Sequence, residues 1–309
     1  MRIVRHAQPG TPDTAIAIGS FDGVHLGHAA ILERVRSAAS DRGLQSAILT
    51  FEPLPREFFA PGEAPPRLTT IQERLAAFAR AGIERAFVQR FDRGFAALSA
   101  QDFAQRLRQR HGARWVMVGE DFRYGAQRSG DLAQLTAAGK RLGFEVEVCP
   151  TVEDGGERIS STRVRRALAR GDFAHAQHLL GRPYSICGRV VHGAGRGRGM
   201  GFPTANVRLG RPRAALQGIF AVKCLGAATR GLEGVASLGI NPAVADGGPA
   251  TLEAFLFDFS GDLYGRRLTI EFVKKLRDEA HFASLDELAA QIRRDCDAAR
   301  EHFRAPRLP

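Results

Sequence analysis

The 309-residue sequence lacks any long hydrophobic run, and its first residues lack the features of an export signal. No stretch resembles a membrane-spanning segment, which needs about 20 consecutive apolar residues. The segment from Met1 to His6 includes two arginines and no apolar core of a signal peptide. We therefore expect a cytoplasmic protein with no membrane partner.

Cysteine is scarce, and the four cysteines lie far apart. They are Cys149, Cys187, Cys224 and Cys296, with no Cys-x-x-Cys pair among them. Their spacing excludes the usual zinc-binding and thioredoxin-like patterns, and it does not indicate a disulfide framework. We expect reduced, structural cysteines, as in a cytoplasmic protein.

Lysine is nearly absent from a strongly basic chain. The formal net charge is +11, and only four of the 44 basic residues are lysines. The arginines are scattered, and no predicted helix carries a basic stripe with interleaved aromatic residues, so the charge does not indicate nucleic acid. A mixed surface with a preference for anionic small molecules fits better. We expect no nucleic-acid partner, and a monomer or weak homo-oligomer.

A phosphate-binding loop of the form Gly-x-x-x-x-Gly-Lys-Ser/Thr is also missing. The only Gly-Lys pair, Gly139-Lys140, is followed by Arg141, which excludes P-loop nucleotide binding. A second glycine-rich stretch, 193–201, fails the Gly-x-Gly-x-x-Gly register and opens no predicted helix. Spacing alone makes it equally consistent with a flexible hairpin loop and with a backbone cradle for phosphates.

The first half of the chain alternates short apolar runs with amphipathic stretches. The pattern predicts strands over 14–19, 45–51, 85–90, 114–119 and 144–149, and helices over 27–42, 69–81, 99–110 and 130–142. Alternating strands and helices favour a parallel sheet with helices on both faces. In such sheets, ligands bind beyond the carboxyl ends of the strands. Helices over 161–170 and 172–180 close this half.

The second half changes pattern after the Leu180-Gly181-Arg182-Pro183 segment. Strands are predicted over 185–192, 217–225, 232–238, 250–258 and 268–274, with Gly-rich turns and no helical pattern between them. This succession is typical of an antiparallel sheet or small barrel. A final amphipathic helix is predicted from about Ser284 to Phe303. We therefore expect two domains, 1–183 and 184–309.

The stretch Ser20-Phe-Asp-Gly-Val-His-Leu-Gly-His28 follows the first predicted strand and opens the first predicted helix. Unpaired N–H groups and the positive dipole end at a helix start favour phosphate. His25 and His28 are three residues apart and so share one face, and Gly27 between them would let a ligand approach the backbone. Metal ligation is an alternative for any histidine pair, but no third ligand of suitable spacing lies nearby.

His25-Leu-Gly-His28 resembles the HxGH signature of nucleotidyltransferases, and its longer context resembles the prokaryotic bifunctional riboflavin kinase/FMN adenylyltransferase family. The resemblance spans nearly the whole chain. Its further motifs begin at Thr50, Val118, Arg158, Leu179, Gly201 and Leu252. It implies an α/β Rossmann-like nucleotidyltransferase domain with a parallel sheet, followed by a mainly antiparallel β-barrel riboflavin kinase domain with a C-terminal helix.

For the first domain, the resemblance implies transfer of AMP from ATP to the phosphate of FMN. That phosphate is already an anionic nucleophile, so alignment and charge neutralisation matter more than a base. The family's nucleotide-binding positions correspond here to His25, His28, Asp121, Arg158, Ser161, Thr162 and Arg165. His28 is also taken as catalytic. Read without the family, the serine and threonine positions are equally consistent with a simple helix N-cap.

For the second domain, the resemblance implies phosphorylation of riboflavin by ATP. A neutral alcohol benefits from a base, and Glu253 matches the family's base. Without the resemblance, Glu253 is equally consistent with an ordinary exposed strand residue. Thr204 and Asn206 offer oxygens to Mg²⁺ and to ATP phosphates. The remaining nucleotide-binding positions are Gly193, Gly197 and Arg198 in the glycine-rich stretch.

Four positions depart from the family pattern. Ser20 stands where the family usually has Asn, and Ser237, Asn241 and Ala243 replace an Asn, an Arg and a Thr of the second domain. The latter three motivate one alternative, an active adenylyltransferase with a weakened kinase. The +11 charge motivates another, a non-enzymatic flavin- or nucleic-acid-binding regulator, against which the intact His25, His28 and Glu253 argue.

Overall fold

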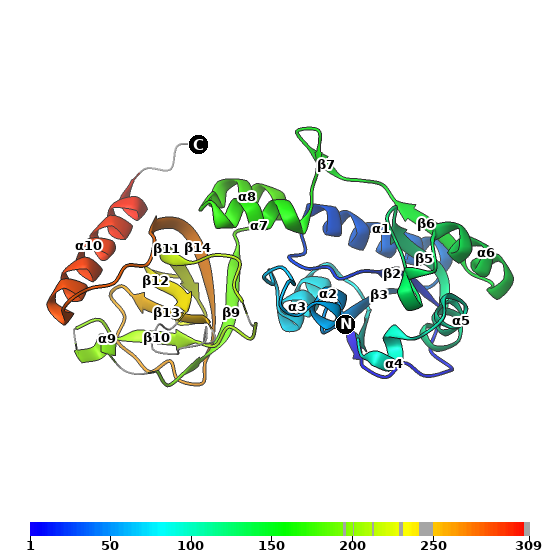
Figure 1. Cartoon of the computed structure of the whole chain (residues 1–309), viewed down its shortest axis with the longest axis horizontal. Helices are drawn as coiled ribbons and strands as arrows, with labels where there is room; N and C mark the ends of the chain where they lie inside the picture. The colour runs from blue at the N-terminus through cyan, green and yellow to red at the C-terminus, as the bar shows by residue number, and fades with distance from the viewer. Residues whose placement is uncertain (194–195, 200, 212, 229–230, 241–249, 306–309) are drawn as a thin grey trace. The chain divides into compact units, whose positions relative to one another are not determined.

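The structure is a computed structural model of the 309-residue chain (Figure 1). It describes all residues except 194–195, 200, 212, 229–230, 241–249 and 306–309. The chain forms two compact units. The first comprises Met1–Pro65 and Ile71–Ser160, and the second comprises Pro66–Thr70 and Ser161–Pro309.

The first unit is built on a sheet that is fully parallel, as predicted, with six strands rather than the five predicted. Its strands are β1 (Arg2–Val4), β2 (Thr14–Ile18), β3 (Gln45–Glu52), β4 (Arg85–Arg90), β5 (Ala113–Gly119) and β6 (Glu145–Cys149), in the order β1-β4-β3-β2-β5-β6. The strand order reverses between β2 and β5. Such a switch point opens a crevice at the carboxyl ends of the strands.

Helices cover both faces of this sheet, and alternate residues of β2 show why. Ala15 and Ala17 pack with α1 (Leu26–Arg42) and α3 (Ile71–Arg80), whereas Ile16 and Ile18 face α5 (Ala100–His111) and α6 (Leu132–Leu142). Because both faces are buried, the strand reads as a continuous apolar run rather than as an alternation.

Several short elements of the first unit are absent from the sequence prediction. They are β1, α2 (Pro55–Phe59), α4 (Arg93–Ala96), the 3₁₀ turn η1 (Ala126–Arg128) and the hairpin of β7 (Glu153–Asp154) and β8 (Glu157–Arg158). Each has five residues or fewer, too few for a hydrophobic period to emerge. Most of them follow the carboxyl ends of strands.

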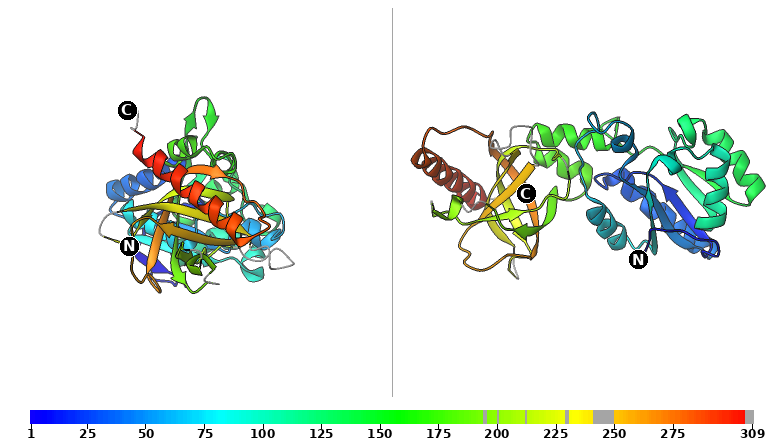
Figure 2. Two further views of the ribbon diagram at one scale, coloured as in Figure 1. Left: turned by 90° about the vertical axis from the view of Figure 1, so that its left-hand side faces the viewer. Right: turned by 60° about the horizontal axis from the view of Figure 1, so that its bottom comes forward.

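The second unit is a closed antiparallel barrel, as predicted. Its strands are β9 (Ser185–Val191), β10 (Thr204–Val207), β11 (Gly218–Leu225), β12 (Leu232–Ile240), β13 (Ala250–Leu256) and β14 (Arg267–Arg277), in the order β10-β13-β12-β11-β14-β9. The helix α10 (Leu285–Arg304) packs on the outer face of β11, β12 and β14 (Figure 2). The prediction missed β10, a four-residue strand in the Phe-Pro-Thr-Ala-Asn motif.

The two compact units divide before α7 (Ser161–Ala169), not at residue 183. Both α7 and α8 (Phe173–Leu180) group with the barrel, and the ring of Phe173 lies 5.8 Å from that of Phe220 in β11. The segment Pro66–Thr70 also belongs to this unit, where Arg211 donates to the Leu68 carbonyl at 2.6 Å. The division of activities at 183 stays a prediction.

Two negative observations concern the described residues only. None of the four cysteines forms a disulfide there, and burial raises the pKa of Cys224 and Cys296 to about 11. Every described helix is too short or too polar to traverse a bilayer.

One buried histidine makes the first unit sensitive to acid. Burial lowers the pKa of His111 to about 4, and its Nδ1 lies 3.1 Å from the Arg106 carbonyl. The unfolded chain takes up this proton near pH 6.5, so stability falls as the pH drops from 6.5 to 4. The loss is about 3 kcal/mol.

We expect His111→Gln to remove this contribution, because glutamine keeps a donor but does not titrate. The stability difference between wild type and variant should shrink by about 3 kcal/mol from pH 7 to pH 4. Urea unfolding followed by fluorescence of Trp115, the single tryptophan, reports on this unit. His6→Gln, at an exposed position, should follow the wild type; an unchanged difference for His111→Gln would contradict the assignment.

Candidate active sites

The turn between β2 and α1 has an unusual backbone. Phe21, Gly23 and Val24 have φ values of 51°, 85° and 43°. The left-handed region is costly for a β-branched residue, and such strain persists only where surrounding contacts impose it. The turn is therefore held by the rest of the unit, and it lies at the switch point of the sheet.

His25 and His28 lie together at the start of α1, as their spacing predicts. The rings stack with centroids 3.7 Å apart, and Phe21 packs against His28 at 5.1 Å. His25 is the N-cap residue: its Nδ1 accepts from the backbone N–H of His28 at 3.3 Å. One N–H expected to be available for phosphate is thus already used by the protein.

His28 is held in its neutral form. Burial is the main cause that lowers its pKa well below the ordinary value, and the charges of His25, Arg158 and Arg74 act in the same direction. Its Nδ1 is buried and has no hydrogen-bond partner among the described residues. An orphaned buried nitrogen costs about 1–3 kcal/mol, and such groups persist at functional sites.

Gly27 packs closely against the protein's own residues. A Cβ at this position would lie 3.2 Å from the His25 ring and 3.5 Å from the carbonyl of Ile159. The protein's own packing is therefore one reason for a glycine here, and the approach of a ligand stays a prediction. The same contact brings the segment that follows Arg158 against the start of α1.

Asp121 and Arg158 meet at the neighbouring strand end. Asp121 follows β5, the strand beside β2, and its carboxylate lies 3.1 Å from the guanidinium of Arg158. Both side chains are largely exposed, so the pair contributes little stability. The carboxyl ends of β2 and β5 thus carry the histidine pair and this ion pair together.

Ser161, Thr162 and Arg165 occupy the first turns of α7 in the second compact unit. Thr162 is exposed and Ser161 half-buried. The guanidinium of Arg165 donates to the carbonyl of Pro66 at 2.7 Å, which fixes the Pro66–Thr70 segment within that unit. Arg165 therefore has a structural contact that its motif did not indicate.

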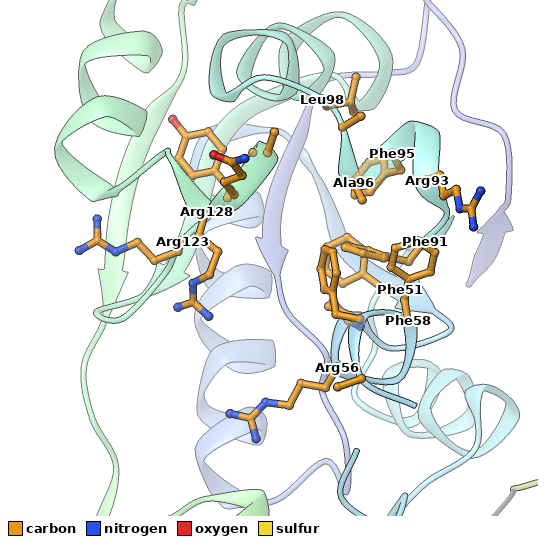
Figure 3. A pocket seen from close by; sticks show the side chains of 18 of the residues that line it. Phe51, Arg56, Phe58, Phe91, Arg93, Phe95, Ala96, Leu98, Arg123 and Arg128 are labelled. Atoms are coloured by element: carbon orange, nitrogen blue, oxygen red, sulfur yellow. The ribbon is translucent and has the colours of Figure 1, made fainter. Parts of the chain in front are cut away.

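An aromatic pocket of about 1000 Å³ lies at the carboxyl ends of β3, β4 and β5, and the sequence analysis missed it. Figure 3 shows phenylalanine rings on one wall and Arg123 and Arg128 on the facing loop. Its aromatic residues are Phe51, Phe58, Phe59, Phe91, Phe95, Phe103, Phe122 and Tyr124, and its arginines are Arg56, Arg93, Arg123 and Arg128. The available signal was the group of phenylalanines that follow two of the predicted strands, Phe58, Phe59, Phe91 and Phe95.

The loop that carries Arg128 is rigidly held. Tyr124 and Gly130 exchange backbone hydrogen bonds at 3.1 and 2.8 Å, and Ala126 donates to Leu98 at 2.7 Å. Gln127 and Arg128 both have positive φ, at 54° and 59°. Consecutive non-glycine residues in this region are rare and mark functional loops.

In the barrel, the side chains of Thr204, Asn206 and Glu253 share one face. Asn206 in β10 pairs directly with Glu253 in β13, and the Thr204 hydroxyl donates to the Glu253 carboxylate at 3.3 Å. Directly paired residues point to the same side of a sheet. Leu252 and Ala254 are buried on the other face of β13.

Gly193 and Gly197 of the glycine-rich stretch lie close to this group. A Cβ on Gly193 would overlap the side chain of Asn206, and one on Gly197 would lie 3.3 Å from the Thr204 hydroxyl. Arg198 lies in α9 (Arg196–Gly199), a single helical turn where no helix was predicted. Backbone bonding between Phe202 and Gly197 at 2.8 Å closes the turn.

Of the second-domain departures, Ser237 lies in this site and two fall outside the described residues. Ser237 in β12 pairs directly with Glu253, so both side chains lie on one face. Asn241 and Ala243 fall in the part of the chain that the structure does not describe.

These features define a class: a nucleotidyltransferase-like parallel sheet joined to a small kinase-like barrel. A sequence profile of FAD synthetases matches residues 7–163, and one of riboflavin kinases matches residues 180–303. The chain belongs to the bifunctional riboflavin kinase/FMN adenylyltransferase family. It phosphorylates riboflavin to FMN and adenylylates FMN to FAD, with ATP as donor.

Relatives of the chain match along most of its length. The bifunctional riboflavin kinase/FMN adenylyltransferase of Escherichia coli K12 is 47% identical, over 93% of this chain and 92% of that protein, and the Pseudomonas fluorescens protein is 45% identical over 97% of each. A crystal structure described as a macrolide-efflux protein from Streptococcus pneumoniae is similar at a TM-score of 0.78 and 30% identity, over 97% of this chain and 98% of that one.

The contact between Gly193 and Asn206 yields a test. We expect Gly193→Ala to displace the Asn206 amide and to lower the riboflavin kinase rate by about tenfold or more, because a misplacement of 1 Å can cost up to 10²-fold. Gly199→Ala is the matched control, since a Cβ there meets nothing within 4 Å. Steady-state FMN formation should separate the two variants; equal rates would contradict the close packing.

Proposed function

We propose that FMN adenylylation takes place at the carboxyl edge of the first unit's sheet, where His25, His28, Asp121 and Arg158 bind the nucleotide. The stacked, neutral histidine pair at the switch point carries this proposal. The family resemblance also assigns nucleotide binding to Ser161, Thr162 and Arg165 of the second unit. The neutral His28 ring can donate to a phosphate oxygen without the cost of burying a cation.

The proposed reaction needs alignment more than acid–base chemistry. An oxygen of the FMN phosphate attacks the α-phosphorus of ATP, the bond to the β-phosphate oxygen breaks, and pyrophosphate leaves. His28 and Arg158 stabilise the charge that develops on the transferred and leaving phosphates. His25 holds the start of α1 through its cap to the His28 N–H.

The aromatic pocket is the proposed flavin site of this reaction. Phe91 lies at its centre, with ring centroids of Phe51, Phe58 and Phe59 between 5.4 and 5.7 Å away. Such a wall suits the flat isoalloxazine ring, which stacks and buries apolar area. Arg128, held on its rigid loop, then provides a guanidinium for the FMN phosphate.

Riboflavin phosphorylation is proposed to use the polar face of β10 and β13. Glu253 accepts the proton of the ribityl hydroxyl as that oxygen attacks the γ-phosphorus of ATP, and the bond from this phosphorus to the β-phosphate oxygen breaks to release ADP. Thr204 and Asn206 present neutral oxygens beside a carboxylate, a donor set that fits Mg²⁺. When bound there, the ion neutralises phosphate charge. Gly193, Gly197 and Arg198 form the loop over the nucleotide.

The remaining parts of the proposal concern the protein as a whole. The two activities divide near residue 183, between 1–183 and 184–309. The enzyme acts in the cytoplasm, where ATP is supplied, on small molecules without nucleic-acid or membrane partners, and as a monomer or weak homo-oligomer.

A second candidate is an active adenylyltransferase with a slow kinase. The position of Ser237 favours it, because a short hydroxyl lies directly beside Glu253 where the family pattern has a longer amide. Chromatography of flavins after incubation with riboflavin and Mg-ATP separates the two. Steady accumulation of FAD supports two working sites, whereas unreacted riboflavin together with rapid conversion of added FMN supports the slow kinase.

Two substitutions test the separation of the sites. His28→Ala should lower FAD formation from FMN by about 10²–10³-fold, because it removes a donor to the transferred phosphates. Glu253→Gln should lower FMN formation by about 10²–10⁴-fold, because it removes the base. Each variant should keep the other rate within about twofold when the two half-reactions are assayed separately. Loss of both rates in one folded variant would contradict two sites.

Arg128→Ala tests the flavin pocket. Loss of a charge-assisted hydrogen bond of about 1.5–3 kcal/mol should raise the KM for FMN by roughly tenfold or more. Lumiflavin, which has the ring system and no phosphate, is the control ligand. Its Ki as a competitor of FMN should stay within about twofold; a parallel weakening of both ligands would show that Arg128 does not contact the phosphate.

A further inference from the structure

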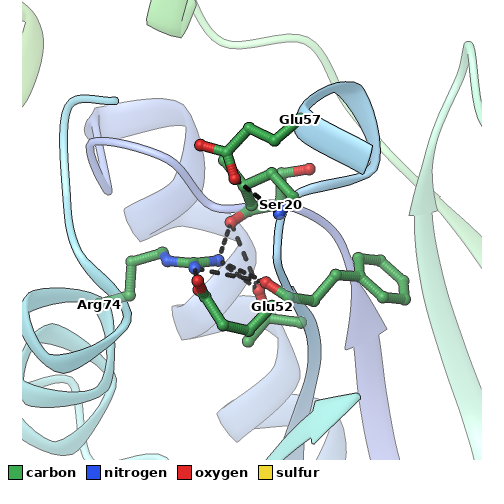
Figure 4. Close-up of polar contacts among 7 residues, drawn as sticks. Ser20, Glu52, Glu57 and Arg74 are labelled. Carbon is green, nitrogen blue, oxygen red and sulfur yellow. Dashed lines mark hydrogen bonds and ion pairs between the residues drawn. The ribbon is translucent and has the colours of Figure 1, made fainter. Parts of the chain in front are cut away.

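Arg74 of α3 is fully buried in the first unit and bonds to the ends of two strands (Figure 4). Its guanidinium donates to the Ser20 carbonyl at 2.8 Å and to the Glu52 carboxylate at 2.7 Å. It also donates to the Thr50 hydroxyl at 2.9 Å and to the Phe51 carbonyl at 3.3 Å. One side chain thus links the residues that follow β2 with the last residues of β3.

A second contact from the same helix reaches the same turn. Phe78 lies four residues after Arg74 and therefore on the same face of α3. Its ring contacts Phe21 edge-on at 5.4 Å, and Phe21 in turn packs against His28 at 5.1 Å. The helix α3 therefore contacts the strained turn at both Ser20 and Phe21, one step away from the histidine pair.

Stability alone does not account for this arginine. A buried ion pair is often no more stabilising than apolar side chains of the same volume. Glu52 is partly exposed and Ser20 exposed, so water could solvate both if the guanidinium were absent. The Thr50 hydroxyl of β3 also donates to the Ser20 carbonyl, at 3.3 Å, and Arg74 donates to both groups, so the guanidinium fixes this link to β3 while Phe21 and Val24 keep positive φ.

We propose that Arg74 is a positioning residue for adenylyl transfer, which holds the Ser20–Val24 turn so that His28 faces the nucleotide. The inference rests on the proposed role of His28. It also accounts for Ser20: the contact uses the main-chain carbonyl, so Arg74 imposes no requirement on the side chain at this position.

The test compares Arg74→Met with Arg85→Met. Arg85 is also buried in this unit, but it lies at the amino end of β4, where it donates to Gln45 at 2.6 Å. We expect Arg74→Met to lower the kcat of FAD formation by about 30–100-fold, with the KM for ATP within about threefold, since misplacement acts on the transition state. Arg85→Met should keep kcat per folded molecule within about twofold.

Arg74→Lys is the conservative substitution in this experiment. Lysine keeps the charge but not the planar fork, so it should recover only part of the lost kcat. Kinase rates of all variants should match the wild type. If Arg74→Met does not fold, Arg74→Lys decides alone: a kcat below about one-tenth with unchanged KM supports the proposal, and wild-type kcat overturns it.

His28→Ala, assayed alongside, distinguishes a failure of the positioning role of Arg74 from a failure of the nucleotide site at His28. Loss of rate in His28→Ala with normal kcat in Arg74→Met overturns the role of Arg74 and leaves the nucleotide site standing. Wild-type rate in His28→Ala overturns the nucleotide site and the positioning role together. Equal kcat for Arg74→Met and Arg85→Met per folded molecule also overturns the proposal.

Discussion

The parallel alignment of β2 between β3 and β5 is the constraint on which the first unit depends. Because all six strands point the same way, every segment that follows a strand emerges at one edge of the sheet. The histidine pair, the ion pair of Asp121 and Arg158, and the aromatic pocket all come from such segments. One topological choice therefore brings together the residues of the proposed nucleotide and flavin sites from parts of the chain that are more than 100 residues apart.

The barrel assembles its chemistry by a different rule. There the strands are antiparallel, and directly paired residues share a face. Asn206, Glu253 and Ser237 come from three strands and form one row because the hydrogen-bond register places them opposite one another. Gly193 lies so close to that row that a Cβ would overlap the Asn206 side chain.

Sequence patterns predicted the long elements well. A long element that is buried on one face shows a hydrophobic period, and a strand that is buried on both faces shows a continuous apolar run. They predicted the parallel sheet, its main helices, the antiparallel barrel and α10. They failed for β10, α2, α4 and η1, which have too few residues for a period. The pocket was missed for a related reason: Phe51, Phe91 and Phe122 become neighbours only when β3, β4 and β5 align.

The sequence by itself determined the chemistry available at each site. The spacing of His25 and His28, the polar residues of Phe-Pro-Thr-Ala-Asn and the position of Glu253 were all readable, since local motifs carry their residue types with them. Only the tertiary structure decided how those groups are held. Burial keeps His28 neutral, Gly27 packs against the protein's own chain, and Arg74 spans the ends of two strands. Burial and long-range hydrogen bonds depend on which segments meet, and one-dimensional spacing does not record that.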